Sequence, residues 1–355
     1  MLDEILEAVG RCHVEPSAEV RLAVSPYRSP SPRSPGVHQL LVMLKPELTR
    51  AMDGPQPQGR ELAWLVFSTL RRHGVRPGAA VVLSGAYVRR FGLVRAHYAL
   101  LNEISREGLP RVRAAARARL REQLPRYARA TDRVLGGHEF LHRFPEFGPR
   151  ALDVLTQNLP VRKLGAGVYA TEVQVDGVPW LVLNPFHPAQ IDHFERAGGS
   201  LVVLECLADA PLRTIRREAV GATDPREAAP GSIRAQLLRR QPDLAWPVCT
   251  SRNAVHASPS SVEAMFALQR YFSSAAGPLP LDETLLGARL AAEGADLTRV
   301  QELARNPDVD EPGFAGPLFD VTEDLEPGPA SDLVRRVAAA RGRPAAGKEA
   351  TRATG

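Results

Sequence analysis

Residues 252–258 read Arg-Asn-Ala-Val-His-Ala-Ser, a short segment in which apolar Ala254 and Val255 lead to His256. We interpret it as the end of a strand that delivers this histidine into a turn of small residues. Upstream, residues 221–234 read GATDPREAAPGSIR, a loop rich in Gly, Ala and Pro that ends at Arg234. A neutral imidazole is a good nucleophile near neutral pH. The two segments together therefore indicate a reaction centre as well as a fold.

The segments on either side predict an α/β core. HQLLVML at residues 38–44 is mostly apolar and ends at Lys45-Pro46, which is typical of a buried strand. Residues 59–73 have helical spacing and stop at Gly74. By the same criteria we expect strands at 80–83, 200–206 and 248–255, and helices at 85–104, 188–197, 211–218 and 260–272.

Residues 105–183 predict a separate unit inserted into this core. A basic helix is expected at about 109–130, where arginine and alanine predominate. Residues 168–175 and 178–183 flank Asp176-Gly177, a strong β-hairpin signal. The basic helix is either a solvated face or a wall that attracts an anionic ligand.

Both ends of the chain predict extensions, at residues 1–36 and 274–355. The first contains a short amphipathic helix at 2–12 and a Ser/Pro-rich linker at 25–36. The second is rich in Ala, Gly, Pro and charge, so we expect it to be partly disordered, above all at 343–355. Helices are expected in it near 283–293, 296–305 and 330–341. The core then occupies residues 37–104 and 184–273.

The composition limits the class of protein. The 355 residues carry a net charge of +5, which favours anionic ligands but is too small to indicate nucleic-acid binding. The three cysteines are scattered and predict neither a disulfide framework nor a zinc cluster. No apolar run approaches the roughly 18 residues of a membrane span. The acidic N-terminal segment lacks the basic start of a signal peptide. We therefore expect a cytoplasmic protein with no membrane partner.

Six segments, taken in chain order, resemble the nucleoside diphosphate kinase family over residues 37–100 and 184–273. They are VMLKP at 42–46, His97-Tyr98, NPFHP at 184–188, Arg217, the 221–234 loop and the 252–258 strand. The resemblance implies that His256 is phosphorylated and that Ser258 hydrogen-bonds it. It also implies phosphate contacts from Lys45, Arg217, Thr223 and Arg234, a ribose contact from Asn253, and a base cleft flanked by Tyr98 and Phe186.

The resemblance further implies a ferredoxin-like βαββαβ antiparallel sheet with helices on one face, to which the insertion adds a helical segment and a β-hairpin. The implied reaction moves the terminal phosphate of ATP or another nucleoside triphosphate to a nucleoside diphosphate. The insertion leaves a specialised second acceptor open, and a homo-oligomer is also open. Mg²⁺ would be bound by the substrate phosphates, with no metal held by protein side chains. Cationic side chains suit this chemistry because charge develops on the phosphoryl oxygens.

Two positions depart from the family's pattern. Pro259 replaces an acidic residue, and Ala267 stands where the family has a glutamate that orients the histidine. Glu263 could compensate only if the helix is rotated or shifted, and losing an orienting carboxylate weakens the positioning of a nucleophile. These departures leave a second hypothesis open, in which the domain binds nucleotide without turnover as a regulatory or scaffolding module.

A zinc hydrolase is the third hypothesis. His138-Glu-Phe-Leu-His142 matches the H-E-x-x-H pattern of zinc proteases. That pattern needs a helix with both histidines on one face, whereas Gly136-Gly137 and Pro145 leave a short helix at most. Taken singly, a histidine after a strand or an arginine in an arginine-rich chain is usually structural or solvated. The interpretation of each residue therefore depends on the whole set.

Overall fold

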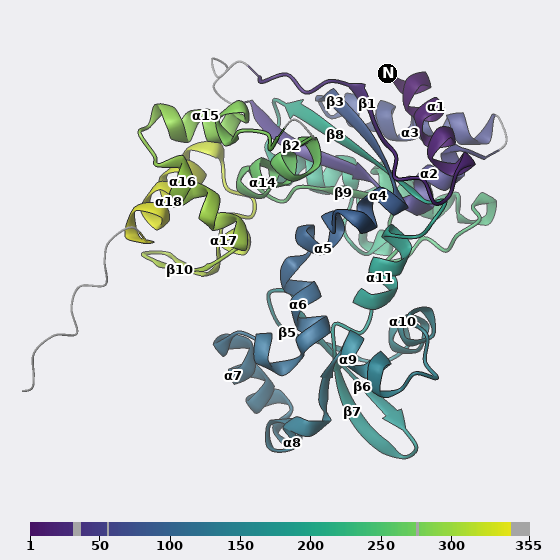
Figure 1. Ribbon diagram of the computed structural model, residues 1–355, viewed down its shortest axis with the longest axis vertical. Helices are drawn as coiled ribbons and strands as arrows, with labels where there is room; N and C mark the ends of the chain where they lie inside the picture. Colours follow the sequence, from purple (N-terminus) through teal and green to yellow (C-terminus); the bar gives the residue numbers. More distant parts are fainter. Residues whose placement is uncertain (31–36, 55–56, 275–276, 342–355) are drawn as a thin grey trace, which may run out of the picture.

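The computed structural model describes residues 1–30, 37–54, 57–274 and 277–341. Part of the Ser/Pro linker and the disorder expected at 343–355 lie outside these residues. The protein is mixed α/β, with antiparallel sheets and many helices (Figure 1). Its main sheet has five strands in the order β1-β3-β8-β2-β9, and every neighbouring pair is antiparallel. These strands are β1 (Arg21–Ser25), β2 (His38–Leu44), β3 (Val75–Ser84), β8 (Ser200–Ala208) and β9 (Val255–Ala257).

Helical crossovers connect the strands of the main sheet. α2 (Pro46–Met52) and α3 (Gln58–Arg72) connect β2 to β3. Between β8 and β9, the helix predicted at 211–218 appears as α12 (Leu212–Thr214) followed by a π-helix at Ile215–Val220. A further helix there, α13 (Ile233–Arg239), was not predicted. The strand expected at 248–255 is wrong for most of its length. Cys249 and Arg252 exchange backbone hydrogen bonds and fold that segment back on itself, so pairing with β2 begins only at Val255.

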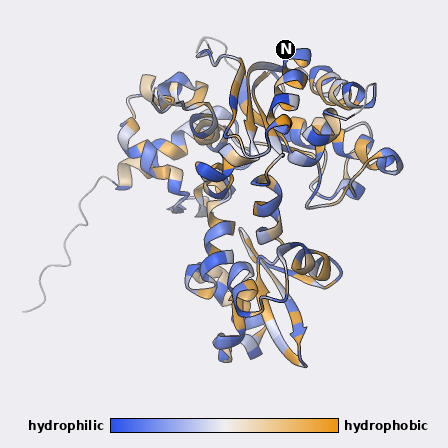
Figure 2. Cartoon of the chain, turned by 45° about the vertical axis from the view of Figure 1, so that its right-hand side comes forward, coloured by the Kyte–Doolittle hydropathy of each residue, from blue (hydrophilic) through white to orange (hydrophobic). Residues whose placement is uncertain are grey.

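Helices cover both faces of the main sheet, which corrects the expectation of helices on one face. Leu40, Val42 and Leu44 pack into one core with α1 (Leu2–Val14) and α3. Leu41 and Met43 pack into a second core with α11 (His187–Phe194) and α14 (Ser261–Phe272). Figure 2 shows the hydrophobic strands of the sheet enclosed between these helices. The HQLLVML run indicated this burial on both faces. A strand with one face in solvent alternates apolar and polar residues, whereas this run is almost continuously apolar.

The insertion folds around its own four-stranded sheet, of order β4-β7-β6-β5. The predicted hairpin is confirmed, because β6 (Val168–Val175) and β7 (Val178–Leu183) pair across Asp176 and Gly177, whose φ angles are 49° and 75°. The expected basic helix is instead divided into α7 (Ala114–Gln123) and α8 (Pro125–Arg129), because Pro125 lacks the amide hydrogen that would continue α7. The other elements are β4 (Val134–Gly136), α9 (Gly137–Arg143), α10 (Pro149–Gln157) and β5 (Val161–Gly165).

Two helical segments join the insertion to the main sheet. α4 (Gly85–Arg90), α5 (Leu93–His97) and α6 (Ala99–Glu107) lead into it, with a break at Gly92 that divides the helix expected at 85–104. α11 returns the chain to β8, and α6 and α11 run side by side in Figure 1. His97 and Tyr98 therefore lie at the junction between the main sheet and the insertion.

The C-terminal extension packs a third core against α14. Its predicted helices appear as α15 (Leu285–Ala292), α16 (Leu297–Glu302) and α18 (Pro327–Arg341). The hairpin of β10 (Asp308–Glu311) and β11 (Phe314–Pro317) and the short α17 (Leu318–Val321) were not predicted. Among the described residues, no helix is both long enough and apolar enough to span a membrane.

Candidate active site

Five of the predicted site residues line one cavity of about 620 Å³ beside β9: Tyr98, Arg217, Thr223, Arg234 and His256. Residues that were not predicted to contact a ligand also line it, among them His97, Arg216, Glu263, Glu323 and Asp324. The cavity therefore collects side chains from the α5–α6 junction, the π-helix, the 221–234 loop, β9, α14 and the C-terminal extension. We call it the His256 cavity.

The backbone before His256 is held in a strained conformation. Ala254 has a φ of 67°, in the left-handed region that residues other than glycine rarely adopt. Its carbonyl accepts a hydrogen bond from the Lys45 backbone N–H (2.8 Å), and its own N–H donates to Glu47 Oε1 (2.9 Å). Two residues further along the chain, His256 pairs with Met43 of β2. The junction of β2 and α2 thus fixes the direction in which the imidazole leaves the sheet.

The imidazole of His256 has one engaged and one open nitrogen. Its Nε2 lies 3.2 Å from His97 Nε2, so one ring donates to the other, and 3.8 Å from Glu263 Oε1. Within the described part of the chain, its Nδ1 makes no hydrogen bond. Burial, with Lys45 and Arg234 nearby, lowers the pKa of His256 to about 3. The ring is therefore neutral at pH 7, as a nucleophile must be.

Glu263 takes the place beside His256 that Ala267 cannot fill. Glu263 lies in the first turn of α14, where its backbone N–H donates to the N-cap hydroxyl of Ser260. One turn later Ala267 is buried in the core. Burial raises the pKa of Glu263 to about 7. The carboxylate of Glu263 lies 3.8 Å from Nε2, beyond hydrogen-bond distance, so its role as a replacement for the orienting glutamate stays a prediction.

Lys45 and Asn253 lie together behind the wall of the cavity. Lys45 is 5% exposed, and its Nζ donates to Asn253 Oδ1 at 2.6 Å. The Asn253 amide donates in turn to the carbonyls of Thr223 (3.0 Å) and Thr250 (3.1 Å). Burial lowers the pKa of Lys45 to about 8. In this structure Asn253 links the lysine to the 221–234 loop, and Thr223 itself is exposed.

Arg234 and Ser258 are engaged by backbone groups. The buried Arg234 guanidinium donates to the carbonyls of Gly221 (2.8 Å) and Val255 (2.6 Å), with a longer contact to that of Asn253. Ser258 is fully buried, and its hydroxyl bonds the backbone of Leu41. Arg234 thus closes the loop onto β9 and still contributes charge to the cavity. Ser258 is bound to β2 and does not line the His256 cavity.

The π-helix presents two arginines of different status to the cavity. Arg216 pairs with Glu323 and with Asp324 (2.8 Å), both from the C-terminal extension. Arg217 is exposed and forms no ion pair with any described residue. π-helical turns are rare and occur often at functional sites. The sequence offered no signal for Arg216, because its acidic partners lie more than a hundred residues further along the chain.

The two predicted aromatic residues are separated. The Tyr98 ring lies edge-on to His256, with centroids 6.1 Å apart. Phe186 instead packs edge-on against Tyr169 of the insertion, with centroids 5.7 Å apart, and does not line the His256 cavity. The structure therefore brings Tyr98 to the histidine but leaves Phe186 at the base of the insertion.

The residues that could hold a metal are not those of the H-E-x-x-H pattern. In that pattern His138 contacts the Ser105 hydroxyl (2.9 Å), and Glu139 accepts from Gly136 N–H at the start of its own helix. Among the described residues, the ligand atoms of His97, His256 and Glu263 lie within 4.8 Å of one another. Two nitrogens and one oxygen suit a transition metal better than Mg²⁺.

Comparisons with known proteins add little to this geometry. No model of a known family matches the chain, and no curated protein matches it. A solved structure described as an NDP kinase from Pyrobaculum aerophilum matches with 18% identity, covering 68% of this chain and 99% of its own, at a TM-score of 0.29. A similarity at this level assigns neither a fold nor an activity to the chain.

Proposed function

We propose that this protein is a nucleotide phosphotransferase that forms a phosphohistidine at His256. The observation that carries the proposal is the open Nδ1 of a neutral imidazole in a cavity that also contains Arg216, Arg217 and Arg234. Phosphoryl transfer depends mainly on positioning and on cationic stabilisation of the phosphoryl oxygens. A neutral histidine beside several guanidinium groups supplies both requirements.

The reaction has two displacement steps. In the first, the Nδ1 lone pair attacks the terminal phosphorus of a nucleoside triphosphate, an N–P bond forms, and the P–O bond to the departing nucleoside diphosphate breaks. In the second, an acceptor oxygen attacks the same phosphorus and the N–P bond breaks. Nδ1 has a free lone pair only when Nε2 carries the proton, and Nε2–H can donate to His97. Mg²⁺ brought in on the substrate phosphates would neutralise part of their charge.

The arrangement of the main sheet supports the proposed fold. Without β1, the strands follow the order β3-β8-β2-β9, with helical crossovers from β2 to β3 and from β8 to β9. A βαββαβ unit of the ferredoxin-like kind has the same order and the same antiparallel neighbours. The acceptor is proposed to be a nucleoside diphosphate or a specialised phosphate acceptor reached from the side of the insertion.

A second candidate is a module that binds nucleotide without turnover. It is favoured by the ion pairs of Arg216 with Glu323 and Asp324, and by the bonding of Ser258 to the backbone of Leu41 outside the lining of the cavity. In this alternative the same arginines bind phosphate, but His256 is not phosphorylated.

Labelling with [γ-³²P]ATP and Mg²⁺ distinguishes the two candidates. The first predicts label that is stable in base, labile in acid, absent from His256→Ala and retained by His142→Ala, a control on an exposed histidine of α9. Tight ATP binding without label favours the second. Label that survives in His256→Ala refutes the phosphohistidine. Metal analysis of the purified protein shows whether His97, His256 and Glu263 hold a transition metal instead.

A further inference from the structure

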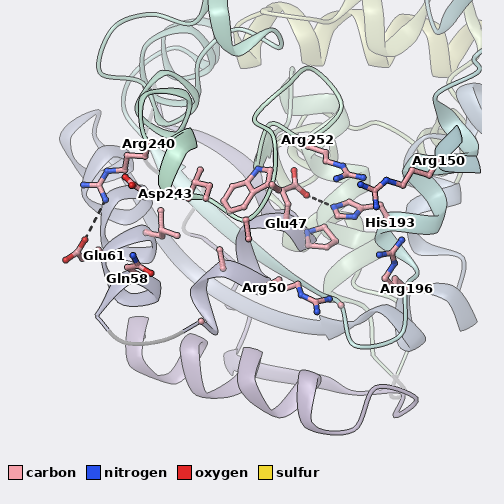
Figure 3. A pocket seen from close by; sticks show the side chains of 18 residues that line it. Glu47, Arg50, Gln58, Glu61, Arg150, His193, Arg196, Arg240, Asp243 and Arg252 are labelled. Carbon is pink, nitrogen blue, oxygen red and sulfur yellow. Dashed lines mark hydrogen bonds and ion pairs between the residues drawn. The ribbon is translucent and has the colours of Figure 1, made fainter. Parts of the chain in front are cut away.

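A second cavity, of about 580 Å³, lies against α2 and shares no lining residue with the His256 cavity. Five arginines line it, and four of them come from four different segments: Arg50 of α2, Arg150 of α10, Arg196 after α11, and Arg252 before β9. Figure 3 shows Arg150, Arg196 and Arg252 gathered around His193, with Arg50 below them. Arg240, Glu61 and Asp243 lie at the opposite end of the cavity in the same view. We call the first end the arginine cluster.

Three of the clustered arginines form no ion pair with the described part of the protein. The side chains of Arg50, Arg150 and Arg252 make no ion pair or hydrogen bond with a described residue, whereas Arg196, just after α11, pairs with Asp192 of that helix (3.1 Å). Guanidinium groups that line one cavity repel one another unless an anion lies between them. Arginine also matches phosphate geometry closely, because its fork can donate to two oxygens at once.

The carboxylates near the cluster do not neutralise it. Glu47 is 5% exposed, and its two oxygens bind His193 Nε2 (2.7 Å) and the Ala254 N–H (2.9 Å). Asp153 of α10 is also buried and accepts a hydrogen bond from Gln157; burial raises its pKa, Arg252 and Arg150 act in the opposite direction, and it forms an ion pair with neither. The guanidinium groups therefore keep their charge available to a ligand.

The same cavity has an apolar wall. Leu62 of α3 and Leu244, Ala245 and Trp246 of the segment before β9 line it together with the arginines. Pockets for small organic ligands combine an apolar lining with a few charged groups that fix the orientation. A free inorganic anion would use the arginines alone, whereas a phosphate ester would use both parts.

We propose that this cavity binds an organic phosphate, with its phosphate at the arginine cluster and its apolar part against the wall of Leu62, Leu244 and Trp246. Arg150 belongs to the insertion and the other three arginines to the core, so a bound phosphate joins the two. Arg252 precedes Asn253, which holds Lys45. The site is separate from the reaction proposed for His256 and would stand if that reaction failed.

Isothermal titration with phenyl phosphate, in the full chain and without nucleotide, tests the site. The double variant Arg150→Gln with Arg252→Gln is expected to weaken binding at least about tenfold, since two charge-assisted contacts are lost. Arg150→Lys with Arg252→Lys keeps the charge but not the fork, and should fall between this variant and the wild type. The matched control, Arg119→Gln with Arg121→Gln, changes two exposed arginines of α7 and should bind as the wild type does.

Two further comparisons exclude other sources of binding. Arg216→Gln with Arg217→Gln removes charge from the His256 cavity and should leave the tenfold effect of the Arg150/Arg252 pair in place. The proposal is overturned if only the Arg216/Arg217 variant loses affinity for phenyl phosphate, or if the α7 control loses as much affinity as the Arg150/Arg252 variant. Inorganic phosphate should bind more weakly than phenyl phosphate, and equal affinities overturn the organic part. Circular dichroism of each variant separates a lost contact from a lost fold.

Discussion

The two arginine-lined cavities differ in how their arginines are used. In the His256 cavity Arg234 is bound to backbone carbonyls and Arg216 to two carboxylates, which leaves Arg217 free of ion pairs with described residues. In the cavity against α2, the side chains of Arg50, Arg150 and Arg252 make no hydrogen bond or ion pair with those residues. The presence of arginines around a cavity is therefore no measure of the cavity's affinity for phosphate. The hydrogen bonds that each guanidinium already makes decide whether it can bind a ligand.

The largest difference between the arginines of the two cavities should appear in the free energy of unfolding of the protein when they are replaced. Arg234→Leu leaves buried carbonyls of Gly221 and Val255 without donors, so the free energy of unfolding should fall by about 3 kcal/mol or more. Arg150→Leu removes an exposed side chain that makes no hydrogen bond or ion pair with a described residue, and should change the free energy of unfolding by less than about 0.5 kcal/mol. Urea denaturation of both variants measures this. Equal losses would mean that the two arginines are used alike.

The pH dependence of binding should also separate the cavities. Burial lowers the pKa of Lys45 to about 8, so its charge, and the attraction it exerts on phosphate, is lost as the pH rises through that value. Affinity for a non-hydrolysable ATP analogue should fall by about tenfold at pH 9, one unit above the pKa. Lys45→Met should bind weakly at every pH.

Phenyl phosphate at the arginine cluster is the control for that series. Arginine stays charged throughout this pH range, and a phosphate monoester is already doubly ionised above its second pKa of about 6. Binding there should be flat between pH 7.5 and 9.5. A parallel fall at both cavities would trace the effect to something other than Lys45.

A smaller effect on nucleotide affinity is expected from removing the ion pairs between Arg216 and the C-terminal extension. Glu323→Gln with Asp324→Asn removes both carboxylates from that guanidinium, so affinity for the ATP analogue should rise by roughly three- to tenfold. Glu302→Gln with Asp310→Asn, two exposed acidic residues elsewhere in the extension, controls for net charge and should have no such effect. An unchanged affinity in the first variant would show that these ion pairs do not compete with phosphate.

The smallest effect is expected from Phe186→Leu. Phe186 contacts Tyr169 and does not line the His256 cavity, so nucleotide affinity should stay within about twofold, as for a substitution away from the site. Equilibrium binding of the ATP analogue measures it. A tenfold loss would return Phe186 to the base cleft that the sequence implied.

The sequence determined the elements of the fold that depend on neighbouring residues. The apolar run at 38–44, the helix that ends at Gly74 and the Asp176-Gly177 turn each contain their own signal, and all three are found. Periodicity and turn chemistry are local, so one segment suffices to predict them. His256 and the 221–234 loop were found in the same way. The grouping of Tyr98, Arg217, Thr223 and Arg234 around that histidine was implied by the resemblance to nucleoside diphosphate kinases and by no local pattern, and all four line its cavity.

Only the tertiary structure decided what each polar side chain touches. Glu263 reaches His256 because α14 begins at Ser261, Arg216 is occupied because a segment far along the chain folds against the π-helix, and Ser258 is directed at Leu41 by the pairing of β9 with β2. The arginine cluster joins residues from four segments and has no sequence pattern at all. Hydrogen bonds and ion pairs act over a few ångströms in space, whatever the separation along the chain, so a sequence can supply a charged residue without showing whether its charge is free.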